Sequence, residues 1–389
     1  MAAAPQVPFD RIHDPVLRRL GEQVAAGNRL TAADGLALYR SADLTGLGVL
    51  ADAVNRAKNG DVVTFASNQH INPTNICVLR KTCVFCGYAR LPKEEGAYRY
   101  TLDQVLGEAA HAADGMTREF HIVGGLDMKA GLAYYEEMFR ALKANFPHVH
   151  IKGLTAVEIA HIARIEKMSW HDVLVALKAA GLDTMPGGGA ETFSAAVRDR
   201  IADKKLAGAE YIGVHRTAHE LGIRTNCTML YGHVETLEDR MEHLQALRDL
   251  QDETGGFLAY IPLAYHPDDN ELGKELGRQG TATTGWDDLR QLAVGRLFLD
   301  NFQHVKSHWI MVTPFLSQVA LHYGVNDLEG TVVREKIYHA VGAHTPQGMS
   351  LAALLTLIRG AGKVPAERDS FYRILRTSFD AEPVAAGVA

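Results

Sequence analysis

The chain has 389 residues, of which 47% are hydrophobic and 22% charged, and its formal net charge is −6. These values are those of an ordinary globular protein, and they give no electrostatic basis for binding nucleic acid or an anionic membrane. No apolar run reaches the roughly 18 to 20 residues that span a bilayer, and residues 1–9 lack the charged start and apolar core of a signal peptide. We therefore expect a cytoplasmic protein with no nucleic-acid or membrane partner.

Residues 14–60 carry apolar side chains at helical spacing, so residues 1–60 are expected to form an N-terminal helical extension. From residue 61 onward, short β-rich segments alternate with longer amphipathic segments. The expected strands are 62–70, 119–123, 149–154, 181–185, 223–230, 257–263, 304–310 and 319–323. Helical patterns fill the gaps, for example at 102–113, 133–145, 170–180, 208–221 and 237–253.

These alternations predict an α/β fold built on a (β/α)8 TIM-type barrel. We expect the barrel to occupy residues 61–328, and a C-terminal helical extension of residues 329–389 to pack on it. Active sites of such barrels lie at the carboxyl ends of the strands. Motifs that directly follow a strand are therefore the candidates for function.

Three of the four cysteines, Cys77, Cys83 and Cys86, lie within ten residues just after the first expected strand. Three thiolates can hold three irons of a cubane iron–sulfur cluster and leave the fourth iron open to a ligand. A zinc site is the alternative, but structural zinc normally takes a fourth nitrogen or sulfur ligand. The candidates for that fourth ligand are His70, His111 and His121. The remaining Cys227 lies in an apolar segment and is expected to be a buried strand residue.

Glycine pairs and runs follow two of the expected strands. Gly124 and Gly125 come after the second strand, and the segment Pro186–Gly189 comes after the fourth. Glycines of this kind let a ligand approach the backbone closely, whereas the lysine of a phosphate-binding loop is missing. Glu158 follows the third strand, where it either binds an ammonium group or forms a helix-capping box with Thr155.

Polar side chains at other strand ends are candidates for contact with a substrate. His70 and Asn72 belong to the first strand and the residues after it, and His266 follows the sixth strand. His233 is a further candidate, because it follows the fifth strand.

The three cysteines with Phe85 before the last of them, the glycine pair and the barrel resemble radical S-adenosylmethionine (SAM) enzymes. Within that superfamily the chain resembles the aminofutalosine synthase family of the menaquinone pathway from about residue 40 to 375. The segments that carry this resemblance are 70–77, 186–191, 215–222, 228–236 and 329–333. The dehypoxanthine futalosine cyclase and the deazaflavin-forming synthases share many of them, while 262–267 and 336–339 favour the aminofutalosine family.

The cysteine spacing departs from the superfamily pattern. Five residues lie between Cys77 and Cys83, where the usual spacing is CxxxCxxC. The insertion lengthens the loop without removing a thiolate, so all three cysteines are still expected to hold a 4Fe-4S cluster.

The resemblance also implies a binding site for SAM. In it, Gly124 and Gly125 would meet the methionine amine with Glu158 nearby, and Arg198 would pair with the methionine carboxylate. Phe85 and the loop that contains Gly187 and Gly188 would flank the adenosine. SAM would be consumed as a co-substrate, because its adenosyl group ends up in the product.

The implied reaction is addition of the 5′-deoxyadenosyl radical to the enol-ether carbon of 3-[(1-carboxyvinyl)oxy]benzoate. Rearrangement onto the ring and decarboxylation would then give 6-amino-6-deoxyfutalosine. That dicarboxylate needs hydrogen-bond donors and an apolar slot. The polar candidates are His70, Asn72, Thr74, Asn226 and His266, with Tyr265 and Met229 as walls.

Several points stay open at this stage. A flavodoxin or ferredoxin is the expected electron donor, and the oligomeric state, a homodimer included, is undetermined. The sequence does not decide whether Glu335 and His339 reach the active site. The alternative functions are a related radical SAM reaction that begins with hydrogen abstraction and a zinc-stabilised binding protein without catalysis.

Overall fold

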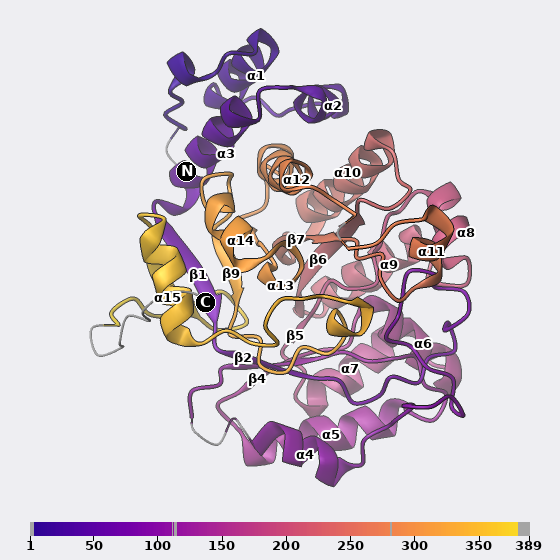
Figure 1. Cartoon of the computed structure of the whole chain (residues 1–389). Helices are drawn as coiled ribbons and strands as arrows, with labels where there is room; N and C mark the ends of the chain where they lie inside the picture. The colour runs from indigo at the N-terminus through magenta and orange to yellow at the C-terminus, as the bar shows by residue number, and fades with distance from the viewer. Residues whose placement is uncertain (1–3, 111, 113–114, 281, 380–389) are drawn as a thin grey trace.

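A parallel seven-stranded sheet forms the centre of the computed structural model, which describes residues 4–110, 112, 115–280 and 282–379 (Figure 1). Its strands lie in sequence order, and every neighbouring pair is parallel. They are β2 (Asn68–Ile71), β3 (Glu119–Ile122), β4 (His150–Gly153), β5 (Thr184–Met185), β6 (Arg224–Tyr231), β7 (Phe257–Ala264) and β8 (His304–Val305). This sheet confirms the predicted α/β barrel class.

Helices between the strands cover the outside of the sheet (Figure 1). They are α4 (Leu102–Ala109), α5 (Leu132–Asn145), α6 (Ala156–Glu166), α7 (Trp170–Ala180), α8 (Ala195–Ala202), α9 (Gly208–Glu220), α10 (Leu237–Thr254), α11 (Glu271–Leu276) and α12 (Gly285–Phe298). Four of them begin at a threonine that forms a capping box, which satisfies the free amides of the first turn. These caps are Thr101, Thr155, Thr236 and Thr284.

A second sheet joins the two ends of the chain. It contains β1 (Val62–Ala66), β9 (Asp327–Gly330), β10 (Val364–Arg368) and β11 (Ile374–Arg376), in the order β11-β10-β1-β9. Backbone bridges link Lys306 to Asp327 and Gln69 to Val333, both in parallel orientation. Residues 327–333 therefore lie between the last and the first strand of the seven-stranded sheet and complete the barrel wall.

The expected strand at 319–323 is wrong, because this segment belongs to the end of α14 (Pro314–Ala320) and the turn that follows it. Thr313 caps that helix, Pro314 occupies its first turn, and the side chain of Val319 is 46% exposed. A proline is well tolerated at this position of a helix. The eighth strand of the barrel is instead β9, which follows this helix.

Two further expectations about strands need correction. The segment 62–70 divides into β1 and β2, which belong to different sheets. Of the segment 304–310, only β8 is a strand, and α13 (Trp309–Val312) follows it. In both cases one expected strand covers two elements with different partners.

The C-terminal region is not purely helical, in contrast to the expectation for residues 329–389. It contains α15 (Leu351–Gly360) and η3 (His339–Val341), but also β10 and β11. In β10, Glu367 and Arg368 are buried, so the strand lacks the apolar alternation that marks a strand in a sequence. Residues 380–389 lie outside the described part of the chain.

The N-terminal region is helical, as expected. It contains η1 (Phe9–Arg11), α1 (Pro15–Ala25), α2 (Ala32–Arg40) and α3 (Leu44–Asn59), which lie together at the top of Figure 1 beside α10 and α12. Their apolar side chains belong to the same core as those of α12 and β7. The division of the chain into domains at residues 60 and 328 stays a prediction.

Candidate active site

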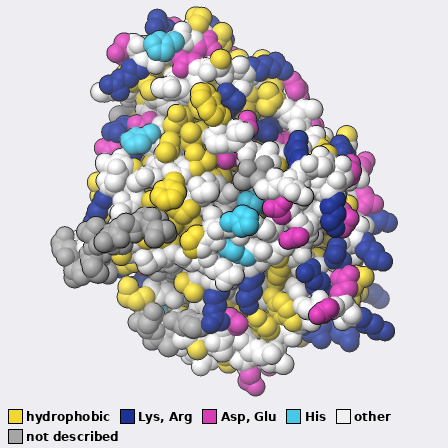
Figure 2. Space-filling model, in the orientation of Figure 1, with side chains coloured by type: hydrophobic (Ala, Val, Ile, Leu, Met, Phe, Trp, Pro, Cys, Tyr) yellow, Lys and Arg dark blue, Asp and Glu magenta, His cyan; other side chains and the backbone are white. Residues whose placement is uncertain are grey.

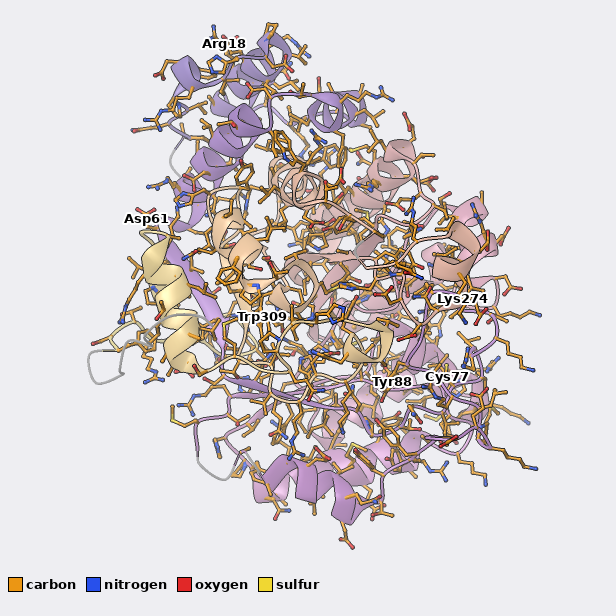
Figure 3. The ribbon with its side chains drawn as sticks, in the orientation of Figure 1. Arg18, Asp61, Cys77, Tyr88, Lys274 and Trp309 are labelled. Carbon is orange, nitrogen blue, oxygen red and sulfur yellow. The ribbon has the colours of Figure 1, made fainter. Side chains whose placement is uncertain are left out.

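A cavity of about 300 Å³ lies at the carboxyl ends of the barrel strands. Cys77, Cys83 and Cys86 all line it, as does Phe85. Figure 3 places Cys77 and Tyr88 at the right of the barrel, and Trp309, which follows the cavity residue His308, nearer its centre. Cys227 lies in β6, fully buried, and does not line the cavity, which confirms its expected role as a core residue.

The loop of the three cysteines is fixed by backbone hydrogen bonds to neighbouring loops. The amide of Cys77 donates to the carbonyl of Arg90 at 2.9 Å, and the amide of Val78 donates to Leu126 at 3.0 Å. Burial raises the pKa of the Cys83 thiol to about 12. The thiol is therefore protonated at neutral pH, and a bound metal must displace that proton.

The three cysteine sulfurs do not all lie within 4.8 Å of one another, as the ligands of a single zinc ion would. Ligand atoms around one tetrahedral zinc lie roughly 4 Å apart or less, given zinc–sulfur bonds of about 2.3 Å. Among the described residues, only His70, His121 and Glu329 bring three such atoms within 4.8 Å of one another, and the cysteines are not part of that set. His111, one candidate for the fourth zinc ligand, lies outside the described residues.

Glycines let the backbone segments around the cavity approach one another. A Cβ atom on Gly125 would lie 2.2 Å from the carbonyl oxygen of Ile76, the residue before Cys77. A Cβ atom on Gly187 would lie 2.5 Å from the Cα atom of Cys227. The glycines predicted to contact SAM, namely Gly124, Gly125, Gly187 and Gly188, all line the cavity.

Glu158 forms the capping box that the sequence allowed and also lines the cavity, while its binding of an ammonium group stays a prediction. Its Oε2 accepts from the amide and the hydroxyl of Thr155, at 2.7 and 2.8 Å, and so completes a capping box at α6. Its Oε1 accepts from the amide of Gly124 at 2.9 Å, and the residue lines the cavity. Burial raises the pKa of Glu158 to about 7.

Arg198 does not lie where the resemblance implied. Its guanidinium is buried and donates to the backbone carbonyls of Ala190, at 2.6 Å, of Thr192, at 3.0 Å, and of Leu206. It does not line the cavity. The position of Arg198 therefore does not support the expected contact with the methionine carboxylate. Its hydrogen bonds instead connect the segments before and after α8.

Lys205 is the cation that lines the cavity next to the cysteines, and the sequence analysis did not identify it. Its Nζ lies 2.5 Å from Glu191 and 5.4 Å from the centroid of the Phe85 ring. Burial opposes the charge of Lys205, but Glu191 holds its pKa above the usual value. The only available signal was Glu191, which ends the glycine-rich segment.

The polar candidates divide into two groups. His70, Asn226 and His266 line the cavity, and Nε2 of His266 lies 3.1 Å from the carbonyl of Met311. Asn72 and Thr74 are buried outside it, where they hydrogen bond to the carbonyls of Val123 and Tyr98, respectively, at 2.9 Å.

Some of the remaining candidates line the cavity and others do not. Tyr265 and Glu335 line the cavity, whereas Met229, His233 and His339 do not. His339 reaches the site indirectly, because its Nδ1 lies 2.7 Å from Glu335.

Histidines gather at the part of the cavity that lies within the barrel. Strand register places His70 of β2 beside His121 of β3, and their rings stack with centroids 4.5 Å apart. His308, which follows β8, lines the same region together with Glu329. His121, His308 and Glu329 are site residues that sequence reasoning missed or, for His121, assigned to zinc.

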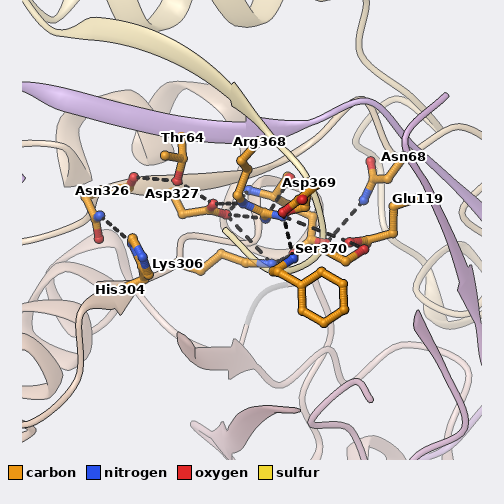
Figure 4. A network of polar contacts seen from close by, with 12 residues as sticks. Thr64, Asn68, Glu119, His304, Lys306, Asn326, Asp327, Arg368, Asp369 and Ser370 are labelled. Atoms are coloured by element: carbon orange, nitrogen blue, oxygen red, sulfur yellow. Dashed lines mark hydrogen bonds and ion pairs between the residues drawn. The ribbon is translucent and has the colours of Figure 1, made fainter. Parts of the chain in front are cut away.

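Below the histidines, the barrel interior holds a network of buried charges (Figure 4). Lys306 Nζ lies 2.7 Å from Glu329, and Lys152 Nζ lies 2.7 Å from Glu119. Arg368 of β10 contacts Asp327 through two nitrogens, at 2.5 and 3.1 Å. Three carboxylates face three cations, so each charge in this dry region has a partner of opposite sign.

Comparison with known families gives two matches that together cover most of the chain. The radical SAM superfamily matches residues 71–247, and the CofH/MqnC C-terminal region matches residues 254–380. The aminodeoxyfutalosine synthase of Thermus thermophilus is 48% identical over 94% of this chain and 97% of its own length. The enzyme of the same name from Streptomyces coelicolor is 43% identical over 92% of this chain and 94% of its own.

More distant relatives share the fold and many residues. The cyclic dehypoxanthine futalosine synthase of Streptomyces coelicolor is 38% identical over 92% of this chain and 89% of its own length. Among solved structures, methylornithine synthase (PylB) superposes with a TM-score of 0.71 at 16% identity, over 89% of this chain and 97% of its own. That likeness concerns the fold alone.

Proposed function

The chain belongs to the radical SAM superfamily, in the branch with the CofH/MqnC C-terminal region, and on this premise we propose that it is an aminodeoxyfutalosine synthase. It joins the adenosyl group of SAM to 3-[(1-carboxyvinyl)oxy]benzoate, below called the enol-ether benzoate, with rearrangement and decarboxylation to 6-amino-6-deoxyfutalosine. The observation that carries this proposal is one cavity that connects three cysteines to a polar floor, in a chain 48% identical to an enzyme of that name.

Cys77, Cys83 and Cys86 would hold a 4Fe-4S cluster. When bound, the cluster supplies the electron that cleaves SAM to methionine and the 5′-deoxyadenosyl radical. The chain contributes a cavity whose inner part is lined by residues of the barrel strands, and exclusion of water there would protect a reactive species. The position of all three cysteines on one cavity supports this assignment.

The residues around the cysteines would bind SAM. The backbone at Gly124 and Gly125 together with Glu158 receives the methionine amine, and Phe85, Gly187 and Gly188 flank the adenosine. We assign the role expected of Arg198 to Lys205, because it lines the cavity and carries a charge that is already held in place by Glu191. A lysine can hold the methionine carboxylate by a charge-assisted hydrogen bond.

The electron donor belongs to the same proposal. A groove of about 430 Å³ lies behind the cysteine loop and shares Leu79, Leu126, Val157 and Lys205 with the cavity. Arg164 and Lys204 are exposed on it, and Figure 2 shows Lys and Arg side chains gathered on this side of the molecule. An acidic electron carrier, such as a flavodoxin or a ferredoxin, fits this surface.

No helix in the described part of the chain has the length and apolar character of a membrane span. We also propose that the enzyme is cytoplasmic and that it forms a homodimer.

Product analysis tests the proposed function. The purified protein is reconstituted with iron and sulfide, reduced with dithionite without oxygen, and incubated with SAM and the enol-ether benzoate. We expect an adenosyl adduct with the mass of 6-amino-6-deoxyfutalosine, formed in proportion to the methionine released. Release of 5′-deoxyadenosine alone would contradict the proposal and would favour a hydrogen abstraction, as in the cyclase alternative.

A paired substitution tests the cluster assignment. Cys83→Ala removes a cavity thiol, whereas Cys227→Ala removes a buried core thiol outside the cavity. We expect the first variant to lose the brown colour and the absorption near 400 nm and the second to keep both. A colourless wild-type protein that contains one zinc per chain would instead favour the zinc-stabilised binding protein.

A further inference from the structure

Three histidines at the floor of the cavity have ring nitrogens without a partner. Nε2 of His70, Nδ1 of His121 and Nδ1 of His308 are buried and form no hydrogen bond with any described residue. Buried polar atoms are normally satisfied, so three unpaired nitrogens on residues that line one cavity point to a ligand that would complete their hydrogen bonds. The three histidines come from β2, β3 and the segment after β8, and all line the cavity.

The histidines lie deeper in the barrel than the cysteines. His70 and His121 are within their strands, whereas the cysteines and Gly124 and Gly125 lie on the loops beyond the strand ends. A ligand that reaches from the cysteine loop to the histidines must therefore be elongated. The enol-ether benzoate has this form, with the reacting double bond at one end and the ring carboxylate at the other.

The charges around the histidines are already balanced. Lys306 faces Glu329, Lys152 faces Glu119, and Glu335 is held by His339 and by the amides of Ile337, Tyr338 and His339. Lys205, which lines the cavity, is paired with Glu191. A carboxylate that enters this region brings an additional negative charge, and a buried charge without a partner is costly.

We propose that His70, His121 and His308 bind the ring carboxylate of the enol-ether benzoate, and that one of these imidazoles takes up a proton from solvent as the carboxylate binds. The identity of the ligand rests on the proposed function. The step is balanced: a neutral imidazole, a proton and a carboxylate become an imidazolium–carboxylate pair, with no other bond made or broken.

The three histidines are neutral when no ligand is bound, and this supports the uptake of a proton on binding. Burial lowers the pKa of His308 to about 4, and it lowers the pKa values of His70 and His121 as well. The free histidines are therefore neutral at pH 7. A carboxylate beside an imidazole favours its charged form, so the pKa rises on binding and a proton is taken up.

A divalent cation is the competing occupant, because ligand atoms of His70, His121 and Glu329 lie within 4.8 Å of one another. The carboxylate of Glu329, however, already contacts Lys306 at 2.7 Å and Asn68 Nδ2 at 3.3 Å. Lys306 and Lys152 are fully buried, and their charges act on Glu329. Because Glu329 is already engaged by Lys306 and Asn68, it is not free to serve as a metal ligand, so we favour the carboxylate.

Calorimetry with a simple probe tests the proposal without turnover. Benzoate and its uncharged analogue benzamide are titrated into the reconstituted protein without oxygen, in phosphate and in Tris buffer, at pH 7 and 8. We expect benzoate to bind with uptake of close to one proton and to weaken by up to about tenfold per pH unit. Benzamide should bind with no proton uptake and with the same affinity at both pH values.

Variants locate the binding site. His70→Gln and His121→Gln should each weaken benzoate binding at least tenfold. His171→Gln serves as the control, because His171 is an exposed residue at the start of α7, outside the cavity. If the cavity variants fail to fold, the number of protons that the wild-type protein takes up when benzoate binds still tests the proposal.

Three results would overturn the proposal: benzoate affinity independent of pH, benzoate affinity unchanged by both cavity variants, or a bound metal ion that is lost in His121→Gln. If any of these occurred while the adenosyl adduct still formed, the binding site would be wrong and the proposed function would stand. If benzoate bound as described but no adduct formed, the proposed function would fail alone.

Discussion

Gly125 is the residue at which the barrel and the cysteine loop lie closest together. A methyl group there would meet the backbone oxygen of Ile76 at 2.2 Å, and a backbone atom cannot rotate away as a side chain can. We therefore expect Gly125→Ala to cost about 1 to 3 kcal/mol and to lower the iron bound per chain after reconstitution. Urea unfolding and iron analysis measure the two effects.

Gly107 provides the matched control for that substitution. It lies in α4, and a methyl group added there meets nothing within 4 Å. Gly107→Ala should stabilise the protein by about 0.5 to 1 kcal/mol, because alanine loses less entropy in a helix, and should leave the iron content unchanged. Equal iron content in both glycine variants would show that the close approach at Gly125 does not position the cysteines.

Lys205 and Glu191 form a buried pair, with side chains 14% and 8% exposed. Removal of one partner leaves the other as a buried charge without compensation. We expect Lys205→Met to lower the free energy of unfolding by roughly 3 to 5 kcal/mol, and the double variant Lys205→Met with Glu191→Gln to recover most of that loss. Additive losses in the two single variants, measured by urea unfolding, would contradict a direct pair.

Strand β10 stabilises β9, the strand that closes the barrel. Arg368 of β10 contacts Asp327 of β9 through two nitrogens, and both side chains are fully buried. Arg368→Met should lower the free energy of unfolding by about 3 to 5 kcal/mol, because Asp327 loses its bidentate partner.

Arg373→Met is the control for Arg368→Met. Arg373 pairs with Asp369 at 2.6 Å, but its own side chain is 68% exposed, and the buried Asp369 also accepts from the amides of Phe371 and Arg373. We therefore expect a loss of about 1 kcal/mol. If both arginine variants unfold at the same urea concentration, β10 does not stabilise the barrel through this pair.

The sequence predicted the helices and strands whose apolar periodicity matches the burial of their side chains. The amphipathic helices and most of the parallel strands appear where apolar periodicity placed them. β9 and β10 were missed because their buried side chains, such as Asp327, Glu367 and Arg368, are charged. Hydrophobic periodicity cannot identify a strand whose partners are ions rather than apolar surfaces.

The candidate site shows the same division. The cysteines and the glycines each follow the end of an expected strand, and they meet in one cavity as expected. The roles of Arg198 and Lys205 could not be separated, because both lie in or near α8 and only the folded chain shows which side chain reaches the cavity. The stacking of His70 on His121 depends on the register of two strands, which no local motif encodes.

For the whole molecule, buried histidines predict a loss of stability in mild acid. Burial lowers the pKa values of His243 and His304 to about 3 and of His308 to about 4, from 6.5 in the unfolded chain. Below pH 6.5 the unfolded chain therefore binds more protons than the folded protein, and the free energy of unfolding falls with pH. Each of these histidines contributes a loss of about 2 kcal/mol between pH 7 and 5.

Glu158 has the opposite effect on the free energy of unfolding, and it offsets about as much of the loss as one of the three histidines contributes. Its pKa is raised to about 7 from 4.5, so the folded protein binds a proton there that the unfolded chain does not bind until the pH is lower. We expect a net loss of several kcal/mol between pH 7 and 5, measured by urea unfolding at both values. Equal or greater stability at pH 5 would mean that these histidines are hydrated in solution.

The central claim is that the cysteine end and the histidine end of one cavity bring the adenosyl group and the enol-ether benzoate together to form a carbon–carbon bond. The most direct measurement uses SAM labelled with carbon-13 at C5′, followed by carbon-13 NMR of the product. We predict that the label appears in the nucleoside adduct as a methylene carbon bonded to a second carbon atom. Recovery of the label only as the methyl group of 5′-deoxyadenosine would contradict the account.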